Sequence, residues 1–351
     1  MKKRLVSVLL CATMVLSMAA CGSSSKGEEK KEDTQTETTT DTRDEEAWKK
    51  EEAYGKTLKY WIGDSCTSAC GVAEAKGFFE DEGLDVEGFK GDSDIEAIGT
   101  GQADIAIGHI AKAAVPITNG VNVTFVGGAH LLKGCKAIYV KADSDIENYD
   151  DLKGKTISTP NGIAASDYNI TARLMLEAGI NPLTDVTLKA VDKEACVAAM
   201  DNGEIDAALL GESYGYKLVN QGILKKIDSK DGNSRNELCC IIMMNRDFIK
   251  KNPITATKLA SAVKKALKWM GENPEETTDL LMELGLEGDD RDQNLALNKD
   301  MEFGLLNFDE QYVTDQMRGI VDDYIEVGLI TAMDDTDEVM DLLWNPIGSA
   351  E

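Results

Sequence analysis

The sequence predicts an α/β protein of two lobes that are joined by two crossing segments and followed by a helical C-terminal tail. Two successive series of short apolar strands alternate with amphipathic helices. An apolar run at 239–244 can lead the chain back to the first series, and the chain after Pro253 is helical in pattern. The folded part, roughly residues 54–351, is also near the size at which one core divides into two.

The first series opens with a strand at 58–62 that ends at Gly63, and an unbroken helix is expected at 72–83. The alternation then predicts further strands at 84–89, 103–107 and 121–126, and helices at 95–100 and 110–118. The last of these strands is expected to stop at Gly127-Gly128, because paired glycines commonly end a strand. Strict alternation of strand and helix favours a mainly parallel sheet.

The second series predicts strands at 137–140, 155–158, 186–190 and 205–210, and helices at 164–178, 193–202 and 214–221. Helices are then expected at 254–270, after Pro274, which suits a first helical turn, and at 310–327. The two crossings are expected near Lys136–Lys141 and Ile241–Arg246. Lobe 1 would accordingly comprise 54–138 and 245–351, and lobe 2 would comprise 139–244.

The N-terminus has the pattern of a secretory signal peptide over residues 1–20, with a basic start and an apolar run too short to span a bilayer. Ser17–Cys21 resembles a bacterial lipobox, which would make Cys21 the lipidated first residue of the mature chain. Residues 22–46 contain no aliphatic or aromatic side chain, so 21–53 is expected to be a disordered acidic tether. An ordinary signal peptide with an incidental Cys21 is the alternative. The expected location is extracytoplasmic, anchored to the membrane without spanning it.

Charge and cysteine usage exclude several functions. The net charge is −26, from 37 basic and 63 acidic residues, which argues against nucleic acid and anionic headgroups as partners. Besides Cys11 and Cys21, six cysteines remain, without zinc-site spacing and with only two histidines in the chain. No metal site and no cofactor are therefore expected. Cys239-Cys240 is expected in the core, and a monomer is expected for a tethered capture protein.

In open α/β sheets ligands bind beyond the carboxyl ends of the strands, where loops and helix N-termini meet. That rule selects as ligand-binding candidates Asp64, Ser65, Cys66, Gly108, His109, His130, Thr159, Asn161, Gly162, Ser166 and Glu212. Each has a structural alternative: Ser65 can be an N-cap, His109 can satisfy local backbone, and Asn161-Gly162 is a turn pair. A carboxylate at Glu212 would favour a ligand with an amine or ring N–H, unless it simply faces solvent.

Cys66 and Cys70 are four residues apart and would share one face of a helix. A thiol near a helix N-terminus has a lowered pKa and can be reactive. Packing as a small buried residue is the commoner fate of cysteine, and a redox or soft-metal role is the alternative.

Six segments in order carry a family resemblance. They are 74–86 (EAKGFFEDEGLDV), 101–108 (GQADIAIG), 151–157 (DLKGKTI), 178–182 (AGINP), 203–208 (GEIDAA), and Trp269 with 273–276 (NPEE), and they cover most of 57–280. This set resembles the extracytoplasmic binding proteins of nitrate/sulfonate/taurine-type ABC importers, which include pyrimidine-precursor binders. The resemblance implies a type II periplasmic-binding-protein-like fold that closes over a small solute and hands it to an ABC permease, without catalysis.

The sequence departs from that family in its second-lobe anion loop. Many relatives carry Gly followed by Ser or Thr, whereas Ile163 follows Gly162, and the next hydroxyl is Ser166. This departure argues against an oxyanion such as sulfonate or nitrate. Two other functions stay open: an extracytoplasmic enzyme using Cys66, His109 and Glu212, and a ligand-binding component that feeds a sensor.

Overall fold

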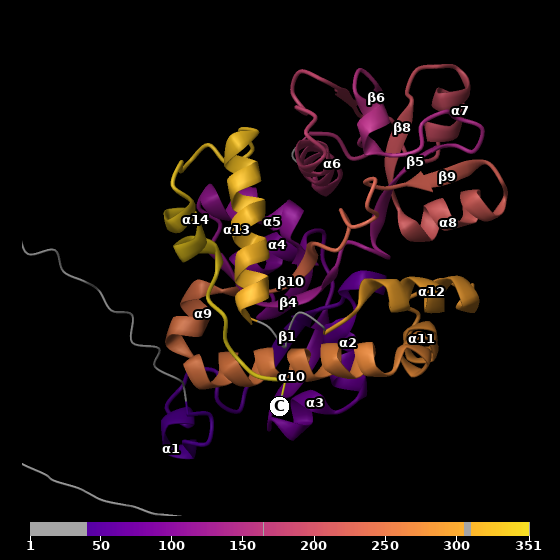
Figure 1. The fold of residues 1–351 in the computed structure, drawn as a ribbon. Coiled ribbons are helices and arrows are strands. Elements are labelled where there is room, and N and C mark those ends of the chain that lie inside the picture. The colour runs from indigo at the N-terminus through magenta and orange to yellow at the C-terminus, as the bar shows by residue number, and fades with distance from the viewer. Residues whose placement is uncertain (1–40, 164, 305–309, 351) are drawn as a thin grey trace, which may run out of the picture. The chain divides into compact units, whose positions relative to one another are not determined.

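The computed structural model describes residues 41–163, 165–304 and 310–350, which contain two five-stranded sheets and the helices around them (Figure 1). The expected signal peptide at 1–20, Cys21 and most of the tether lie outside these residues. Residues from Thr40 onward form one unit by their contacts. No helix in the described part of the chain is long and apolar enough to cross a membrane.

The first sheet has the strand order β2-β1-β3-β10-β4. Its members are β1 (Thr57–Trp61), β2 (Asp85–Phe89), β3 (Ile105–His109), β4 (Val123–Leu131) and β10 (Leu238–Asn245). Strands β2, β1 and β3 run parallel, whereas β10 pairs antiparallel with both β3 and β4. Every residue of β4 and β10 is buried, which explains why both strands are mostly apolar.

The second sheet has the order β7-β6-β8-β5-β9. It contains β5 (Lys136–Lys141), β6 (Thr156–Ser158), β7 (Thr187–Lys189), β8 (Ala207–Gly211) and β9 (Leu224–Ile227). Strand β5 is antiparallel to β8 and β9, while β6 is parallel to β7 and β8. Four strands of each sheet run in one direction, and only β10 in the first sheet and β5 in the second run against them. Both sheets are therefore mixed, with the parallel strands expected from the sequence in the majority.

The helices cover both sheets. Before β5 lie α1 (Glu45–Trp48), η1 (Ser65–Thr67), α2 (Ala69–Ala75), α3 (Phe78–Asp81), α4 (Asp94–Gly99) and α5 (Ile110–Thr118). Between β5 and β9 lie η2 (Tyr149–Leu152), α6 (Ser166–Glu177), α7 (Cys196–Asp201) and α8 (Glu212–Asn220). The tail contains α9 (Arg246–Lys251), α10 (Pro253–Glu272), α11 (Pro274–Glu283), α12 (Arg291–Met301), α13 (Glu310–Glu326) and α14 (Thr336–Leu343).

Two short segments connect the sheets, and they bond to each other. Residues 132–135 lead from β4 to β5, and residues 228–237 lead from β9 to β10. The backbone N–H of Leu132 donates to the carbonyl of Glu237 at 2.8 Å, and that of Lys133 donates to Arg235 at 2.9 Å. We call 132–135 the first crossing segment and 228–237 the second. The second lobe is 136–227, and the first lobe is the described residues outside that range and outside the two crossing segments. Both crossings lie before the positions expected from the sequence, because β5 and β10 already belong to their sheets.

Three further expectations differ from the structure. The single helix at 72–83 is broken into α2 and α3, because Gly77 takes a left-handed conformation with φ 76°. Strand β4 does not stop at Gly127-Gly128 but continues to Leu131, since both glycines pair with β10. A side chain at Gly127 would meet the Lys264 Cε atom at 2.5 Å, so glycine permits the close approach of α10. Strand β9 was not expected at all.

The apolar core follows from strand alternation. One large cluster fills the first lobe and continues under one face of the second sheet through Ile138, Ile157 and Leu209. A smaller cluster lies on the other face of that sheet and includes Tyr139 and Leu210. Buried charged side chains also lie in the second crossing segment, among them Arg235 and Glu237.

Candidate functional site

Six cysteine and histidine side chains converge at the carboxyl end of β3, where both crossing segments begin or end. His109 is the last residue of β3, His130 lies near the end of β4, and Cys66 lies on η1. The first crossing segment contributes Cys135, and the start of β10 contributes Cys239 and Cys240. We call these six residues the Cys/His cluster; they include both histidines of the chain.

Strand register explains how the cluster forms. Cys240 on β10 pairs with His109 on β3 and with His130 on β4, so it lies between the two histidines. The pairing of β10 with β4 is irregular between Leu238 and Cys240. Neighbouring residues of a regular strand point to opposite faces, and an irregularity of this kind breaks that alternation. The thiols of both Cys239 and Cys240 therefore reach the same histidine ring.

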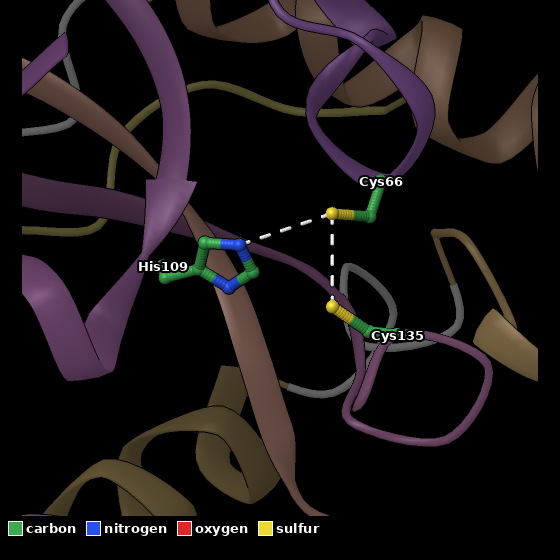
Figure 2. A group of neighbouring side chains, drawn as sticks. All are labelled: Cys66, His109 and Cys135. Carbon is green, nitrogen blue, oxygen red and sulfur yellow. Dashed lines mark hydrogen bonds between the residues drawn. The ribbon is translucent and has the colours of Figure 1, made fainter. Parts of the chain in front are cut away.

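The distances within the cluster are short. The Sγ atoms of Cys239 and Cys240 each lie 3.4 Å from His109 Nδ1. On the other side of the ring, Cys66 Sγ lies 4.0 Å from His109 Nε2, and the Cys135 thiol donates to Cys66 Sγ at 3.7 Å. Figure 2 shows Cys66, His109 and Cys135 pointing toward one another from three separate segments.

Among the described residues, three overlapping groups have their metal-ligating atoms within 4.8 Å of one another, all drawn from the cluster: Cys66, His109 and Cys135; Cys66, His130 and Cys240; His109, Cys239 and Cys240. Cys66 and His109 are partly exposed, whereas the other four members are buried. The cluster can thus be reached from the side of Cys66 and His109.

The electrostatics of the cluster reflect these contacts. Hydrogen bonds from Cys135 and Cys240 hold the pKa of the Cys66 thiol well below its usual range, and the pKa of Cys239 is lowered by the same partners. The pKa of Cys135 is raised, chiefly by its hydrogen bonds with Cys239 and Cys66, and the pKa of Cys240 is raised chiefly by burial. Burial acts to lower the pKa of His109, but the charge of Cys239 and its contacts with Cys66 outweigh it and raise the value to about 10.

Two other domain cysteines stay outside the cluster. Cys70 is fully buried on α2, and burial raises the pKa of its thiol to about 12. Cys196 lies on α7 in the second lobe, where its thiol contacts Ser158 and local backbone carbonyls. Cys66 and Cys70 do not share one helix face, because Cys66 belongs to η1 and Cys70 to α2.

Glu212 clamps the crossing segments together. Its carboxylate accepts hydrogen bonds from the Gly134 backbone N–H at 3.2 Å and from Lys226 at 2.8 Å, and it is ion-paired with Arg235. Gly134 lies in the first crossing segment and Arg235 in the second. The residue is 2% exposed, so the alternative that Glu212 faces solvent is wrong. The carboxylate is engaged by three protein donors, and it lies outside the Cys/His cluster.

The second-lobe loop at 159–162 forms a separate polar site. Asn161 donates to Asp167 through Nδ2 at 2.6 Å, and Lys136 is ion-paired with the same carboxylate. Asn161, Lys136 and Asp167 are among the residues lining a cavity of about 330 Å³. Thr159 is buried and accepts the Gly162 N–H at 2.8 Å, which closes the turn, and Ser166 begins α6 just beyond it.

Asp64 and Ser65 line another cavity, of about 410 Å³, together with Ser213 of the second lobe and Glu287 of the tail. Ser65 has a left-handed φ of 44°, and its N–H donates to the Leu286 carbonyl at 2.8 Å. The two residues that precede Cys66 in the chain therefore line this cavity. Gly108 is buried, and a side chain there would meet Met243 at 2.4 Å. Gly108 therefore permits close packing of β3 on β10.

Glu287 provides a pH-dependent prediction. Burial raises the pKa of its carboxyl to about 7. A hydrogen bond from Asn298 opposes this shift, and the charge of Cys66 adds to it. A raised carboxyl pKa stabilises the fold below the unfolded value of 4.5, and this stabilisation is lost as the pH rises through about 7. Glu287→Gln is therefore expected to be more stable than the parent at about pH 8, by about 1 kcal/mol after allowing for partial exposure, and similar at about pH 4.5.

Thermal unfolding of both proteins across this pH range measures the effect. Glu283→Gln, an exposed change on α11, is the matched control and should show no such pH-dependent difference. A constant offset between Glu287→Gln and the parent at all pH values would contradict the expectation.

Sequence reasoning selected Cys66, His109 and His130 but missed Cys135, Cys239 and Cys240 as neighbours of these residues. The missed residues come from a crossing segment and from a strand expected to be core. One signal was available: both histidines and Cys66 follow strands of the first series, and the other three cysteines lie close to the expected crossings. Local spacing could not reveal the cluster, because its members are far apart in sequence.

Comparisons with known proteins agree with this architecture. The family model described as "NMT1/THI5 like" matches residues 68–277. The chain belongs to the NMT1/THI5-like family. Within the range of that match lie the second lobe, both crossing segments and all of the Cys/His cluster except Cys66.

Relatives of this NMT1/THI5-like chain include both binding proteins and synthases by name. The putative binding protein YtlA of Bacillus subtilis is 26% identical over 231 residues, covering 64% of this chain and 68% of YtlA. The 4-amino-5-hydroxymethyl-2-methylpyrimidine phosphate synthase THI13 of Saccharomyces cerevisiae is 24% identical over 223 residues, covering 58% of this chain and 63% of the synthase. The chain thus matches less than two thirds of the length of THI13.

The fold is that of periplasmic binding proteins. The periplasmic aliphatic sulphonate binding protein SsuA from Escherichia coli superposes with a TM-score of 0.66 at 18% identity, covering 83% of this chain and 92% of SsuA. At this identity the likeness concerns the fold alone. The expected two-lobed, type II binding-protein architecture with a helical C-terminal region is confirmed.

Proposed function

We propose that this protein is a lipid-anchored solute-binding protein that captures a small molecule between its lobes and delivers it to an ABC-type import permease. One observation carries the proposal: β3 and both crossing segments meet at a single cluster of polar, partly accessible side chains between the two sheets. Binding there contacts the segments about which the lobes can close. The fold shared with a periplasmic sulphonate-binding protein, and the similarity to a putative binding protein, support the same role.

Contacts between the lobes support a closing motion. Asn169 on α6 donates to the Ala111 carbonyl on α5 at 2.7 Å, and Gln293 on α12 donates to the Ser213 carbonyl on α8 at 3.0 Å. Each of these is a single hydrogen bond, which can form or break with a modest change in free energy. The lobes also share the Arg173–Asp323 ion pair and part of the large apolar cluster.

A thermal-shift panel of organic and inorganic solutes, run on the chain from Asp41 onward, tests this function. A bound solute at ~100 times its dissociation constant should stabilise the native state by about 2.7 kcal/mol, and it should be recovered unchanged. Consumption of the solute would contradict the binding role. The anchor is tested on the full chain: the parent should fractionate with membranes, and Cys21→Ala should not.

An enzyme is the second candidate, because Cys66 and His109 lie close together and the yeast relative is named a synthase. A thiol beside an imidazole can act as a nucleophile. Glu212, the third member of the expected set, is engaged by the crossing segments and does not orient His109. Turnover of a solute that stops in Cys66→Ala would favour the enzyme over the binding protein.

A further inference from the structure

The donor atoms of the Cys/His cluster are all soft or intermediate in character. The cluster contains four thiols and two imidazoles and includes no carboxylate. Thiolates select ions such as Cu⁺ and Zn²⁺, and imidazole suits the same metals. An ion that prefers oxygen, such as Mg²⁺ or Ca²⁺, would find no suitable ligands among these six side chains.

The spacing of the donors matches that of metal ligands. Zinc–sulfur and zinc–nitrogen bonds of about 2.3 and 2.0 Å imply tetrahedral edges of about 3.8 Å between two sulfurs and about 3.5 Å between sulfur and nitrogen. The Cys66 and Cys135 sulfurs are 3.7 Å apart. The Cys240 sulfur is 3.4 Å from His109 Nδ1. These two separations match such edges, and the donor atoms of Cys66, His130 and Cys240 all lie within 4.8 Å of one another.

His130 supplies independent evidence for a ligand. Its ring is fully buried, and Nδ1 lies 2.7 Å from the Leu131 carbonyl, which fixes the proton on Nδ1. The other nitrogen, Nε2, has no partner at hydrogen-bonding geometry within the described residues, although it is buried. A buried nitrogen without a partner is costly. In metal sites, one ring nitrogen of a histidine binds the metal and the other donates to a carbonyl, which orients the ring. His130 has this arrangement, because Nδ1 lies next to a carbonyl and Nε2 faces the thiols of the cluster.

We propose that the Cys/His cluster binds a thiophilic metal ion, Cu⁺ or Zn²⁺, through Cys66, Cys240 and His130, with a fourth donor from the remaining three members. The thiols lose their protons to solvent as the metal–sulfur bonds form, and no change of oxidation state is required. The ion is the solute that the lobes capture, and this part of the inference rests on the proposed function.

The position of the cluster fits a captured ion. Cys66 and His109 are the partly exposed members, and the 410 Å³ cavity reaches the two residues that precede Cys66. An ion entering beside Cys66 would then contact Cys240 and His130, which are buried. Because Cys135 lies in the first crossing segment and Cys240 lies near the start of β10, just after the second, occupancy would bias the hinge between the lobes.

The test uses the chain from Asp41 onward, which contains its own core, reduced and desalted without oxygen. Titration with Zn²⁺ or Cu⁺ against a chromophoric chelator should show one tightly bound ion per chain. Cys66→Ser and Cys240→Ser should each weaken binding by about 100-fold or more, since each removes a ligand. Cys70→Ser and Cys196→Ser are the matched controls, outside the cluster, and should bind like the parent. Absence of binding for both metals, or equal losses in the control variants, would overturn the site.

A measurement without mutation guards against variants that fail to fold. Alkylation of the parent protein, read by peptide mass spectrometry, should label Cys66 in the free protein and spare it in the metal-loaded protein. The thiol of Cys70 should be unaffected in both. A competing outcome is a disulfide between Cys66 and Cys135; if the reduced protein still binds no metal once that disulfide is removed, the inference fails.

Failure of the inference and failure of the proposed function give different results. If an organic solute stabilises the protein and neither metal binds, the metal site is wrong and the capture function stands. Cells lacking this protein should take up less of the metal that binds in vitro. Unchanged uptake, with tight binding in vitro, would leave a resident metal site and overturn its role as the captured solute.

Discussion

Replacing Arg173 by alanine is expected to lower the free energy of unfolding by about 3–5 kcal/mol, because it leaves the buried carboxylate of Glu237 and the half-buried carboxylate of Asp323 unpaired. Arg173 lies on α6 of the second lobe with 7% of its side chain exposed. It is ion-paired with Glu237, with Asp323 at 2.8 Å and with Glu177 at 2.9 Å. The pairs join the second lobe to the second crossing segment and to the tail helix α13.

The loss should depend on pH. Burial already raises the pKa values of Glu177 and Asp323, and the guanidinium opposes that effect. Without Arg173 their pKa values should rise further, so protonation at lower pH relieves the unpaired charge. The deficit of Arg173→Ala relative to the parent is therefore expected to be smaller at about pH 5 than at about pH 8.

Denaturant unfolding monitored by circular dichroism at both pH values measures this effect. Arg318→Ala is the matched control, since Arg318 pairs with Asp337 and their side chains are 46% and 75% exposed. That change should cost less than about 1 kcal/mol. If both variants lost the same free energy of unfolding, burial of the Arg173 ion pairs would not be the reason for the loss in Arg173→Ala.

Glu212→Ala is expected to cost about 3 kcal/mol, at the lower end of the range for a broken buried ion pair. The loss is moderated because Arg235 keeps its pair with Asp228 at 2.9 Å, and because Lys226 is partly exposed. The Gly134 N–H would lose its acceptor, which adds to the cost. Both crossing segments would lose a contact that joins them.

Urea unfolding again provides the measurement. Glu212→Gln retains an acceptor for Gly134 and should be less damaging than Glu212→Ala. Glu204→Ala removes an exposed pair with Lys189, whose side chains are 50% and 45% exposed, and should be nearly neutral. If Glu212→Ala were as mild as Glu204→Ala, the clamp between the crossing segments would have no energetic importance.

The fold was largely predictable, because apolar periodicity depends on local sequence. Helix α5 occupies the expected residues, and most strands differ from expectation by one or two positions. The failures have local physical causes. Strand β4 continues through two glycines because its partner β10 comes from more than a hundred residues later. The antiparallel direction of β10 depends on the same distant pairing.

The candidate site was only partly predictable. Strand-end reasoning found His109 and Cys66, because a ligand position beyond β3 follows from topology. It could not find Cys239 and Cys240, since their orientation depends on an irregularity in pairing with β4. Glu212 was selected correctly as a strand-end residue but is not free to bind a ligand. Arg235 and Lys226 are ion-paired with its carboxylate. A partner from another segment decides whether such a carboxylate is available.

The insertion of β10 between β3 and β4 has a consequence for folding order. The second lobe is continuous in sequence, so its five strands can pair as soon as residues 136–227 are available. The first sheet cannot be completed before β10, which follows the second lobe in the sequence. Contacts between segments that are far apart in sequence form slowly. In the interval β4, all nine of whose residues are buried in the native structure, lacks β10, the strand with which it pairs. Delayed closure of this sheet is therefore the step at which a newly made chain is most exposed to aggregation, and chaperone protection would act there.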